Sequence, residues 1–123
     1  MRSDVLLCGL FRGRVERFSD EVVDFLNQQL ELLGNLITIS EPEYNKCTAS
    51  IAVRFELDVL GDPSVEAVLE GTWDVKELLK NDKVCFSGLA VAEINVVPNI
   101  GGVEQTTTDL INDAIPNDFC IDV

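Results

Sequence analysis

The sequence predicts an α+β protein: a mostly antiparallel sheet with two helices packed on one face. The main observation is a stretch from Thr48 to Val75 in which apolar and polar residues alternate on both sides of a turn at Gly61–Ser64. Alternation of this length is typical of paired strands with one buried and one solvated face. Two further stretches, Ser19–Gly34 and Asn99–Ala114, carry apolar residues at helical spacing. Both helices are expected to cover the apolar face of the hairpin.

Length and composition indicate one domain over residues 1–123, with enough apolar residues, 46%, for a real core. The net charge is −13, from 22 acidic and 9 basic residues. Such a balance argues against a nucleic-acid binder and against binding to anionic membranes, because both need clustered Lys and Arg. Acidity also keeps a protein soluble. A basic protein partner, mimicry of nucleic acid, and protection of an exposed apolar surface are the other interpretations.

The four cysteines, Cys8, Cys47, Cys85 and Cys120, are scattered, and the sequence has no histidine. The usual zinc ligand sets are therefore not available, and we expect no metal site. Four is an even number, so disulfides are allowed, but no secretion signal is recognisable. No apolar run reaches the length of a membrane span, about 20 residues. The expectation is a cytoplasmic protein with reduced thiols and no membrane insertion.

The N-terminal third predicts a strand followed by a helix. Val5–Phe11 is a short apolar run that favours a strand, with a bend or bulge at Arg12–Arg14. Ser19 is a good helix N-cap, and acidic residues follow it in the first turn, where the helix dipole favours them. Gly34 is a natural position for the helix to end.

The middle of the chain is expected to be mainly strands. Leu36–Ile39 predicts a strand before the hairpin, and residues 76–82 predict a single helical turn or a wide loop. Val84–Val97 is apolar and interrupted by Gly88. Its β-branched second half favours a strand, although part of it would tolerate a helix.

The C-terminal part predicts a helix and a last strand. The helix Asn99–Ala114 contains Gly101–Gly102 and three consecutive threonines, which are poor helix formers. It is therefore expected to depend on tertiary or subunit packing. Pro116 ends it, and the alternation in Phe119–Val123 suggests an edge strand.

No group of residues predicts catalysis or a cofactor. Carboxylate pairs such as Glu56/Asp58 and Glu66/Glu70 project from the wet face of the hairpin and are expected to be solvated. A cysteine nucleophile would lack the histidine that usually activates it. No phosphate-binding glycine loop is present. We therefore expect a protein that is not an enzyme.

Four apolar residues are candidates for binding a protein client. Trp73 belongs to the buried face by alternation, so core packing is one interpretation, and an anchor for a partner is the other. Leu78, Leu79 and Phe86 lie in or beside the segment that follows. Apolar residues there either cover the core or form an exposed patch with a use.

From Ile51 to the C-terminus the order of features resembles the SecB-type protein-export chaperones. A long alternating hairpin ends in Glu70–Trp73, an apolar segment follows, and a helix lies between Pro98 and Pro116. The resemblance implies an antiparallel four-stranded sheet with helices on one side, assembled as a dimer or tetramer. It also implies ATP-independent holding of unfolded clients along apolar grooves, without a cofactor.

The leading hypothesis is a non-catalytic, chaperone-like, homo-oligomeric protein that binds unfolded or partly folded clients. An alternative is an acidic inhibitor or immunity protein that blocks a basic partner. Another is an assembly subunit whose edge strands, the N-terminal run and Phe119–Val123, pair with neighbouring copies.

Overall fold

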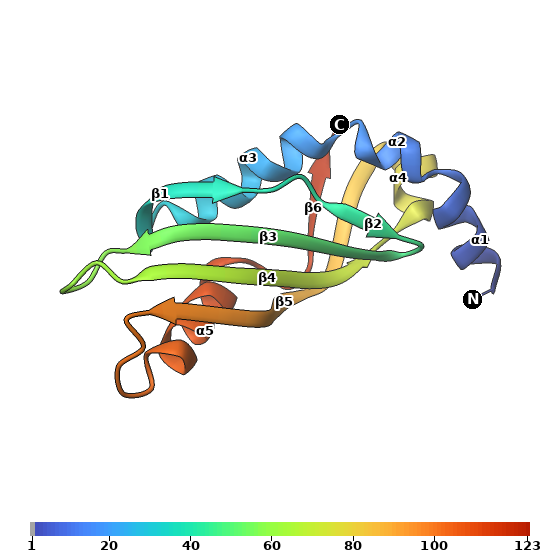
Figure 1. The fold of residues 1–123 in the computed structure, drawn as a ribbon. Coiled ribbons are helices and arrows are strands. Elements are labelled where there is room, and N and C mark those ends of the chain that lie inside the picture. The colour runs from blue at the N-terminus through green and yellow to red at the C-terminus, as the bar shows by residue number, and fades with distance from the viewer. Residues whose placement is uncertain (1) are drawn as a thin grey trace.

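In a computed structural model the chain forms one curled sheet with helices on one face and at one end (Figure 1). The structure describes residues 2–123, and the surroundings of side chains from Val5 onward. The helices are α1 (Arg2–Leu10), α2 (Arg12–Glu16), α3 (Ser19–Leu30), α4 (Val75–Asn81) and α5 (Val103–Ala114). The strands are β1 (Gly34–Ile39), β2 (Glu43–Asn45), β3 (Thr48–Leu57), β4 (Ser64–Trp73), β5 (Lys83–Val97) and β6 (Phe119–Asp122).

The sheet is antiparallel throughout and is built on the predicted hairpin. Its strand order is β1-β3-β4-β5-β6, and the short β2 also pairs with β3. The pairing of β3 with β4 runs without interruption from Thr48 opposite Thr72 to Glu56 opposite Ser64. The predicted α+β class and the central hairpin are therefore confirmed.

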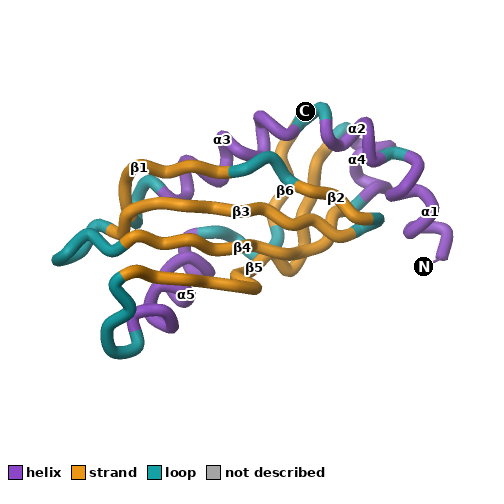
Figure 2. The backbone as a smooth tube through the Cα atoms, viewed as in Figure 1, coloured by secondary structure: helices purple, strands orange, loops and turns teal. Residues whose placement is uncertain are grey.

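Helices α3 and α5 lie on the same face of the sheet, while the opposite face carries no helix (Figures 1 and 2). Helix α3 buries Val22, Leu26 and Leu30, which recur at helical spacing along one side. Helix α5 buries Thr107 and Ile111. Both predicted helices thus cover the apolar face of the hairpin.

The core lies between this face and the helices. It is filled by alternate residues of the long strands, as period-two alternation requires. The largest fully buried side chains are Phe55, Phe86, Leu26, Leu30, Ile51, Leu69, Leu78, Leu89, Ile111, Ile115, Val15 and Val22.

Side chains of α5 cover the edge of the second half of β5. The Oδ1 atom of Asn112 accepts a hydrogen bond from the backbone N–H of Val91, at 3.0 Å. The Oε2 atom of Glu104 accepts one from the N–H of Val96, at 3.3 Å. An exposed strand edge invites pairing with another chain, and these contacts block that at β5. The opposite edge of the sheet is formed by β1.

The predicted strand at Val5–Phe11 is wrong, because this segment forms most of α1. The predicted bend at Arg12–Arg14 is wrong too, since it begins α2. Cys8 is buried, and Leu7 and Phe11 pack against the core. These three lie on one side of a helix, and a run this short has no periodicity that separates helix from strand.

Later elements sharpen the sequence predictions. Most of the segment 76–82 lies in a true helix, α4 (Val75–Asn81), whose N-cap Asp74 accepts hydrogen bonds from the backbone N–H groups of Lys76 and Glu77. Val84–Val97, for which the sequence favours a strand but leaves a helix open, is a strand and lies in β5. Helix α5 begins only at Val103, after two glycines at φ 41° and φ 76° that occupy left-handed conformations.

Candidate functional site

The four residues predicted to bind clients lie close together, but mostly inside the core. Trp73 and Phe86 are cross-strand partners in β4 and β5 and are 4% and 1% exposed. Leu78 in α4 is 0% exposed, and Leu79 beside it is half-buried. Of the two interpretations for Trp73, the structure shows the first: its side chain packs in the core. The binding role of these residues stays a prediction, and in this structure they form no open groove.

Trp73 fixes the turn between β2 and β3. Its indole Nε1–H donates a hydrogen bond to the carbonyl of Lys46, at 2.7 Å. Its backbone N–H donates to the carbonyl of Cys47, at 2.8 Å. The ring meets Tyr44 edge-on, with centroids 5.7 Å apart. A buried indole satisfied in this way holds the turn firmly against the core.

Tyr44 has the most unusual environment of the titratable side chains. Its hydroxyl is buried and, within the described part of the chain, has no hydrogen-bond partner. Burial of the phenol raises the pKa of Tyr44 well above its ordinary value, and the carboxylate of Glu16 raises it further. The phenol is therefore neutral at physiological pH.

Several exposed apolar residues belong to the elements at the end of the molecule where the β3–β4 hairpin turns. This end of the molecule carries the hairpin tip, the start of β1 and the loop from β5 to α5 (Figure 1). Leu60 at the tip is fully exposed, and Asp58 and Asp62 flank it. We call the set the apolar end; its members are Leu32, Leu36, Val59, Leu60, Val97 and Ile100.

Sequence reasoning missed the apolar end, although it left a signal. Val59 and Leu60 directly precede Gly61, so apolar residues continue into a turn where polar ones are usual. The alternation assigned Val59 to the buried face of the strand. The structure ends β3 at Leu57 instead, which leaves Val59 in the turn and exposed.

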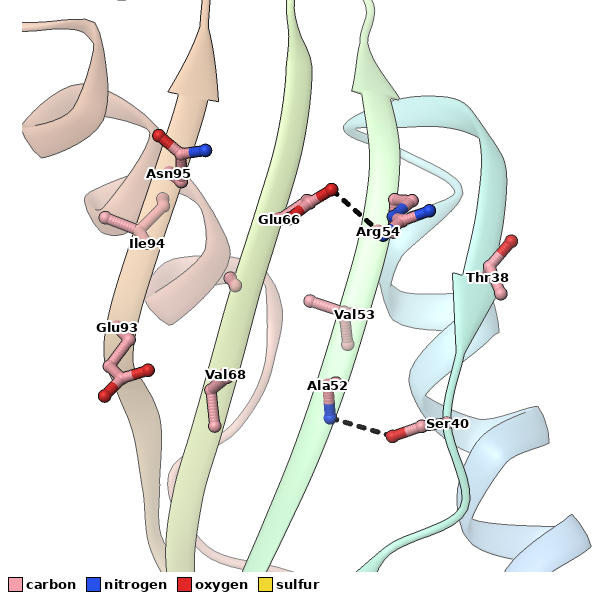
Figure 3. Close-up of a pocket in the computed structure, with 11 residues that line it drawn as sticks. Thr38, Ser40, Ala52, Val53, Arg54, Glu66, Val68, Glu93, Ile94 and Asn95 are labelled. Carbon is pink, nitrogen blue, oxygen red and sulfur yellow. Dashed lines mark hydrogen bonds and ion pairs between the residues drawn. The ribbon is translucent and has the colours of Figure 1, made fainter.

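The uncovered face of the sheet is hollowed and acidic. A hollow of about 440 Å³ crosses β1, β3, β4 and β5 (Figure 3). At its centre lie the small or apolar Ala52 and Val68, and Glu66 and Glu93 point from neighbouring strands. Its residues are Thr38, Ser40, Ala52, Val53, Arg54, Glu66, Ala67, Val68, Glu93, Ile94 and Asn95.

Negative charge exceeds positive charge on this face. Arg54 in β3 forms an ion pair with Glu66 in β4, with Nη2 and Oε1 3.0 Å apart (Figure 3). A second hollow, of about 490 Å³, continues along β2, β3 and β4 and includes Glu43 and Glu70. Both hollows together form the acidic face, in which carboxylates outnumber the one arginine. Glu66 and Glu70, expected on the wet side of the hairpin, lie on it.

The sequence has no histidine. Among the described residues, no group of three or more cysteine or acidic side chains is placed to hold a metal ion. The carboxylates of the acidic face are exposed to solvent, where they attract cations.

The structure corrects the expectation of reduced thiols. Cys8 is bonded to Cys47, and Cys85 is bonded to Cys120. The first disulfide joins α1 to the turn before β3, and the second joins β5 to β6. The cytoplasmic location stays a prediction.

Searches against protein-family models, curated proteins and solved structures find no match to this chain. Within the described residues, none of the helices combines the length and the apolar character that crossing a bilayer requires. The surfaces of this structure are therefore the basis for a functional assignment.

Proposed function

We propose that this protein is a non-catalytic, chaperone-like protein that binds unfolded or partly folded protein clients. The observation that carries the proposal is the apolar end. Large apolar side chains gathered on a surface are unusual for a protein that works alone and are typical of binding sites for other proteins. The carboxylates that flank Leu60 keep such a surface soluble while it is unoccupied.

Secondary features support the same proposal. The resemblance to SecB-type chaperones depends on the order of the elements. This order is two long paired strands, an apolar strand, a helix between Pro98 and Pro116, and a short last strand. The proposal includes assembly of several copies. The unpaired outer edge of β1 favours it, because an edge strand offers free backbone groups to a neighbouring chain.

The direct test is suppression of aggregation of a denatured, unrelated protein, without nucleotide and at physiological salt. We expect suppression at near-stoichiometric ratios, because apolar surface covers the exposed apolar segments of the client. The double variant Leu60→Ser/Ile100→Ser is expected to weaken suppression. Leu10→Ser is the matched control, since Leu10 is an exposed leucine of α1 outside the apolar end.

Two outcomes would contradict this proposal. One is no suppression, even in excess and under both oxidising and reducing conditions. The other is equal suppression by the wild type and by Leu60→Ser/Ile100→Ser. Neither substitution removes a core residue, so lost binding would not reflect unfolding. A cooperative thermal transition at the wild-type temperature checks this point.

The acidic face favours a second candidate, a partner with a basic surface that this chain covers or inhibits. The other alternative is an assembly subunit that pairs through two edge strands. Only β6 remains as a candidate strand for it, because the N-terminal run is helical.

A basic partner can be recognised by the salt dependence of its binding. Long-range attraction between opposite charges raises association rates and falls with ionic strength. One-to-one binding of a basic protein, weakened by salt and by Glu66→Gln/Glu93→Gln, would favour the basic partner over an unfolded client. Binding unchanged by salt would rule it out.

A further inference from the structure

We propose that α1 is a redox-controlled lid. Breaking the Cys8–Cys47 disulfide releases it and opens a second apolar binding site at α4. The occupant of this site is an apolar segment of an unfolded polypeptide. The inference deepens the proposed client-binding function and rests on that function for its occupant. It also gives a way to expose Leu78 and Leu79, which are predicted to bind clients and are buried and half-buried in the disulfide-bonded structure.

Helix α1 has little intrinsic stability. It contains 9 residues, which is shorter than the isolated helices that persist in water. Gly9 lies in its last turn, and glycine destabilises a helix by about 1 kcal/mol relative to alanine. Most of its described apolar surface faces solvent, since Leu6 and Leu10 are 69% and 77% exposed. Its place on the molecule therefore depends on the few residues that point inward and on the disulfide.

The inward residues of α1 show what the site below can accept. Cys8 is completely buried, and Leu7 packs against the core. Helix α1 contacts α4, and the two lie together at the end of the molecule away from the apolar end (Figures 1 and 2). A segment that presents similar apolar groups can replace α1 on this surface.

The apolar residues of the site belong to α4. Val75 and Leu78 are buried and Leu79 is half-buried. Without α1, helix α4 loses a neighbouring helix, while it keeps its contact with β5 and its N-cap at Asp74. The site therefore opens without loss of the sheet.

The rest of the N-terminal segment stays attached when α1 leaves. In α2, Val15 is completely buried, and Arg14 forms an ion pair with Asp82, with Nη2 and Oδ1 3.1 Å apart. Phe11 separates the two helices and lies outside the regular helical conformation, at φ −103° and ψ 13°. Movement is accordingly confined to α1, which turns about Phe11.

The accessibility of the two sulfurs decides how the disulfide opens. Cys47 is half-buried, whereas Cys8 is 0% exposed. A dithiol reductant attacks Sγ of Cys47 as a thiolate, and Sγ of Cys8 leaves as a thiolate. The second thiol of the reductant then displaces Cys47 and closes its own disulfide. Two electrons and two protons pass from the dithiol, so both cysteines end as thiols and the reductant is oxidised.

The test measures apolar surface in the full chain with a fluorescent dye of the anilinonaphthalene sulfonate type. We expect dye fluorescence of the wild type to rise about threefold on reduction by a dithiol. Cys8→Ser/Cys47→Ser is expected to show the high signal with and without reductant. The matched control is Cys85→Ser/Cys120→Ser, which lacks the other disulfide and keeps the lid. It should start low and rise on reduction, like the wild type.

Two further variants separate the lid from general unfolding. Gly9→Ala adds a methyl group with no heavy atom within 4 Å, so it strengthens α1 without a clash and should reduce the rise on reduction. Leu79→Ser in the Cys8→Ser/Cys47→Ser background should lower dye binding and client holding, because it removes an apolar side chain of the site. A cooperative thermal transition in each variant shows that the fold is kept.

The outcomes of the two proposals are distinguishable. Equal dye signals for oxidised wild type and Cys8→Ser/Cys47→Ser would overturn the lid, and so would a high signal in the oxidised Cys85→Ser/Cys120→Ser control. A rise in dye signal on reduction without any suppression of client aggregation would keep the lid and overturn the proposed function. Suppression that is independent of redox state would keep the proposed function and overturn the lid.

Discussion

The two ends of the chain are each joined to the sheet by a disulfide, but they differ in what else holds them. The bonded cysteines are 39 residues apart at the N-terminal end and 35 apart at the C-terminal end. Closing loops of similar length restricts the unfolded chain to a similar degree. The two disulfides should therefore stabilise the fold about equally, and any difference between the ends comes from the folded state.

The C-terminal end has several contacts besides its disulfide. Strand β6 pairs with β5 over four residues, from Phe119 opposite Phe86 to Asp122 opposite Lys83. Phe119 stacks on Phe25 of α3, with ring centroids 4.4 Å apart. The N–H of Val123 also donates to the carbonyl of Asp82, at 3.1 Å.

The N-terminal end has no comparable ladder. Helix α1 is short, contains a glycine and buries one completely enclosed side chain, Cys8, among those described. The two disulfides therefore have different local consequences. At the C-terminal end the disulfide reinforces a strand that is already paired, whereas at the N-terminal end it decides whether a helix stays in place.

The largest expected effect concerns global stability. Cys8→Ser/Cys47→Ser and Cys85→Ser/Cys120→Ser should each lower the free energy of unfolding by about 4 kcal/mol, because each removes a restriction on the unfolded chain. Urea unfolding followed by circular dichroism measures both.

Hydrogen exchange then separates the two variants locally. Protection of α1 amides should be lost in the first variant, while β6 amides stay protected in the second. Loss of β6 protection to the same degree would contradict the comparison.

The next effect isolates the aromatic contact at the C-terminal end. Phe119→Ala should lower the free energy of unfolding by about 2 kcal/mol, because a half-buried ring that contacts Phe25 and Phe86 is lost. In the Cys85→Ser/Cys120→Ser background it should also release β6, seen as fast exchange of its amides. Full protection of β6 in that background would mean that the ladder alone holds the strand.

Long periodic elements could be predicted from the sequence, whereas the short N-terminal helix could not. The hairpin and the helix at Ser19–Leu30 follow from periodicity, because each buries one face over many residues. Val5–Phe11 was predicted wrongly because a short apolar run has no period, and its helix depends on a contact far away in the chain. Four cysteines allow three pairings, and their spacing does not select between them.

The candidate sites also differ in whether local sequence patterns predict them. Burial of Trp73 could be predicted from alternation, since the residue continues the apolar face of β4 and is 4% exposed. The acidic face was partly predictable, because Glu66 and Glu70 lie on the wet side of the hairpin. The apolar end was not predicted, because it combines a turn, a strand start and a loop that only the folded chain brings together.

A smaller effect is expected on the stability of α1 at the N-terminal end. Gly9→Ala should raise the stability of α1 by up to about 1 kcal/mol, since alanine loses less conformational freedom in a helix and no atom obstructs its methyl group. The measurement is amide exchange of residues 5–10 in the oxidised protein. Gly13→Ala, a position with the same free space in α2, is the matched control and should leave α1 unchanged. Slower exchange in α1 for both variants would show that α1 and α2 move as one unit.

The smallest effect at neutral pH concerns Tyr44, the buried phenol in the turn that Trp73 fixes. Tyr44→Phe should stabilise the fold by up to about 1 kcal/mol, because it removes a buried hydroxyl that has no described partner. The pH dependence gives the sharper test. The pKa of Tyr44 is raised in the folded state. Below the ordinary pKa of tyrosine, about 10, the phenol is neutral in both the folded and the unfolded state, so its ionisation costs no stability there.

Above that pH, ionisation in the unfolded chain should reduce wild-type stability by up to about 1.4 kcal/mol per pH unit until the folded-state pKa is reached. Tyr44→Phe lacks this loss, so the stability difference between variant and wild type should widen as the pH rises above about 10. Urea midpoints across this range measure it. A constant difference would mean that the phenol reaches water in the folded protein, and the turn between β2 and β3 would then be as mobile as α1 is proposed to be.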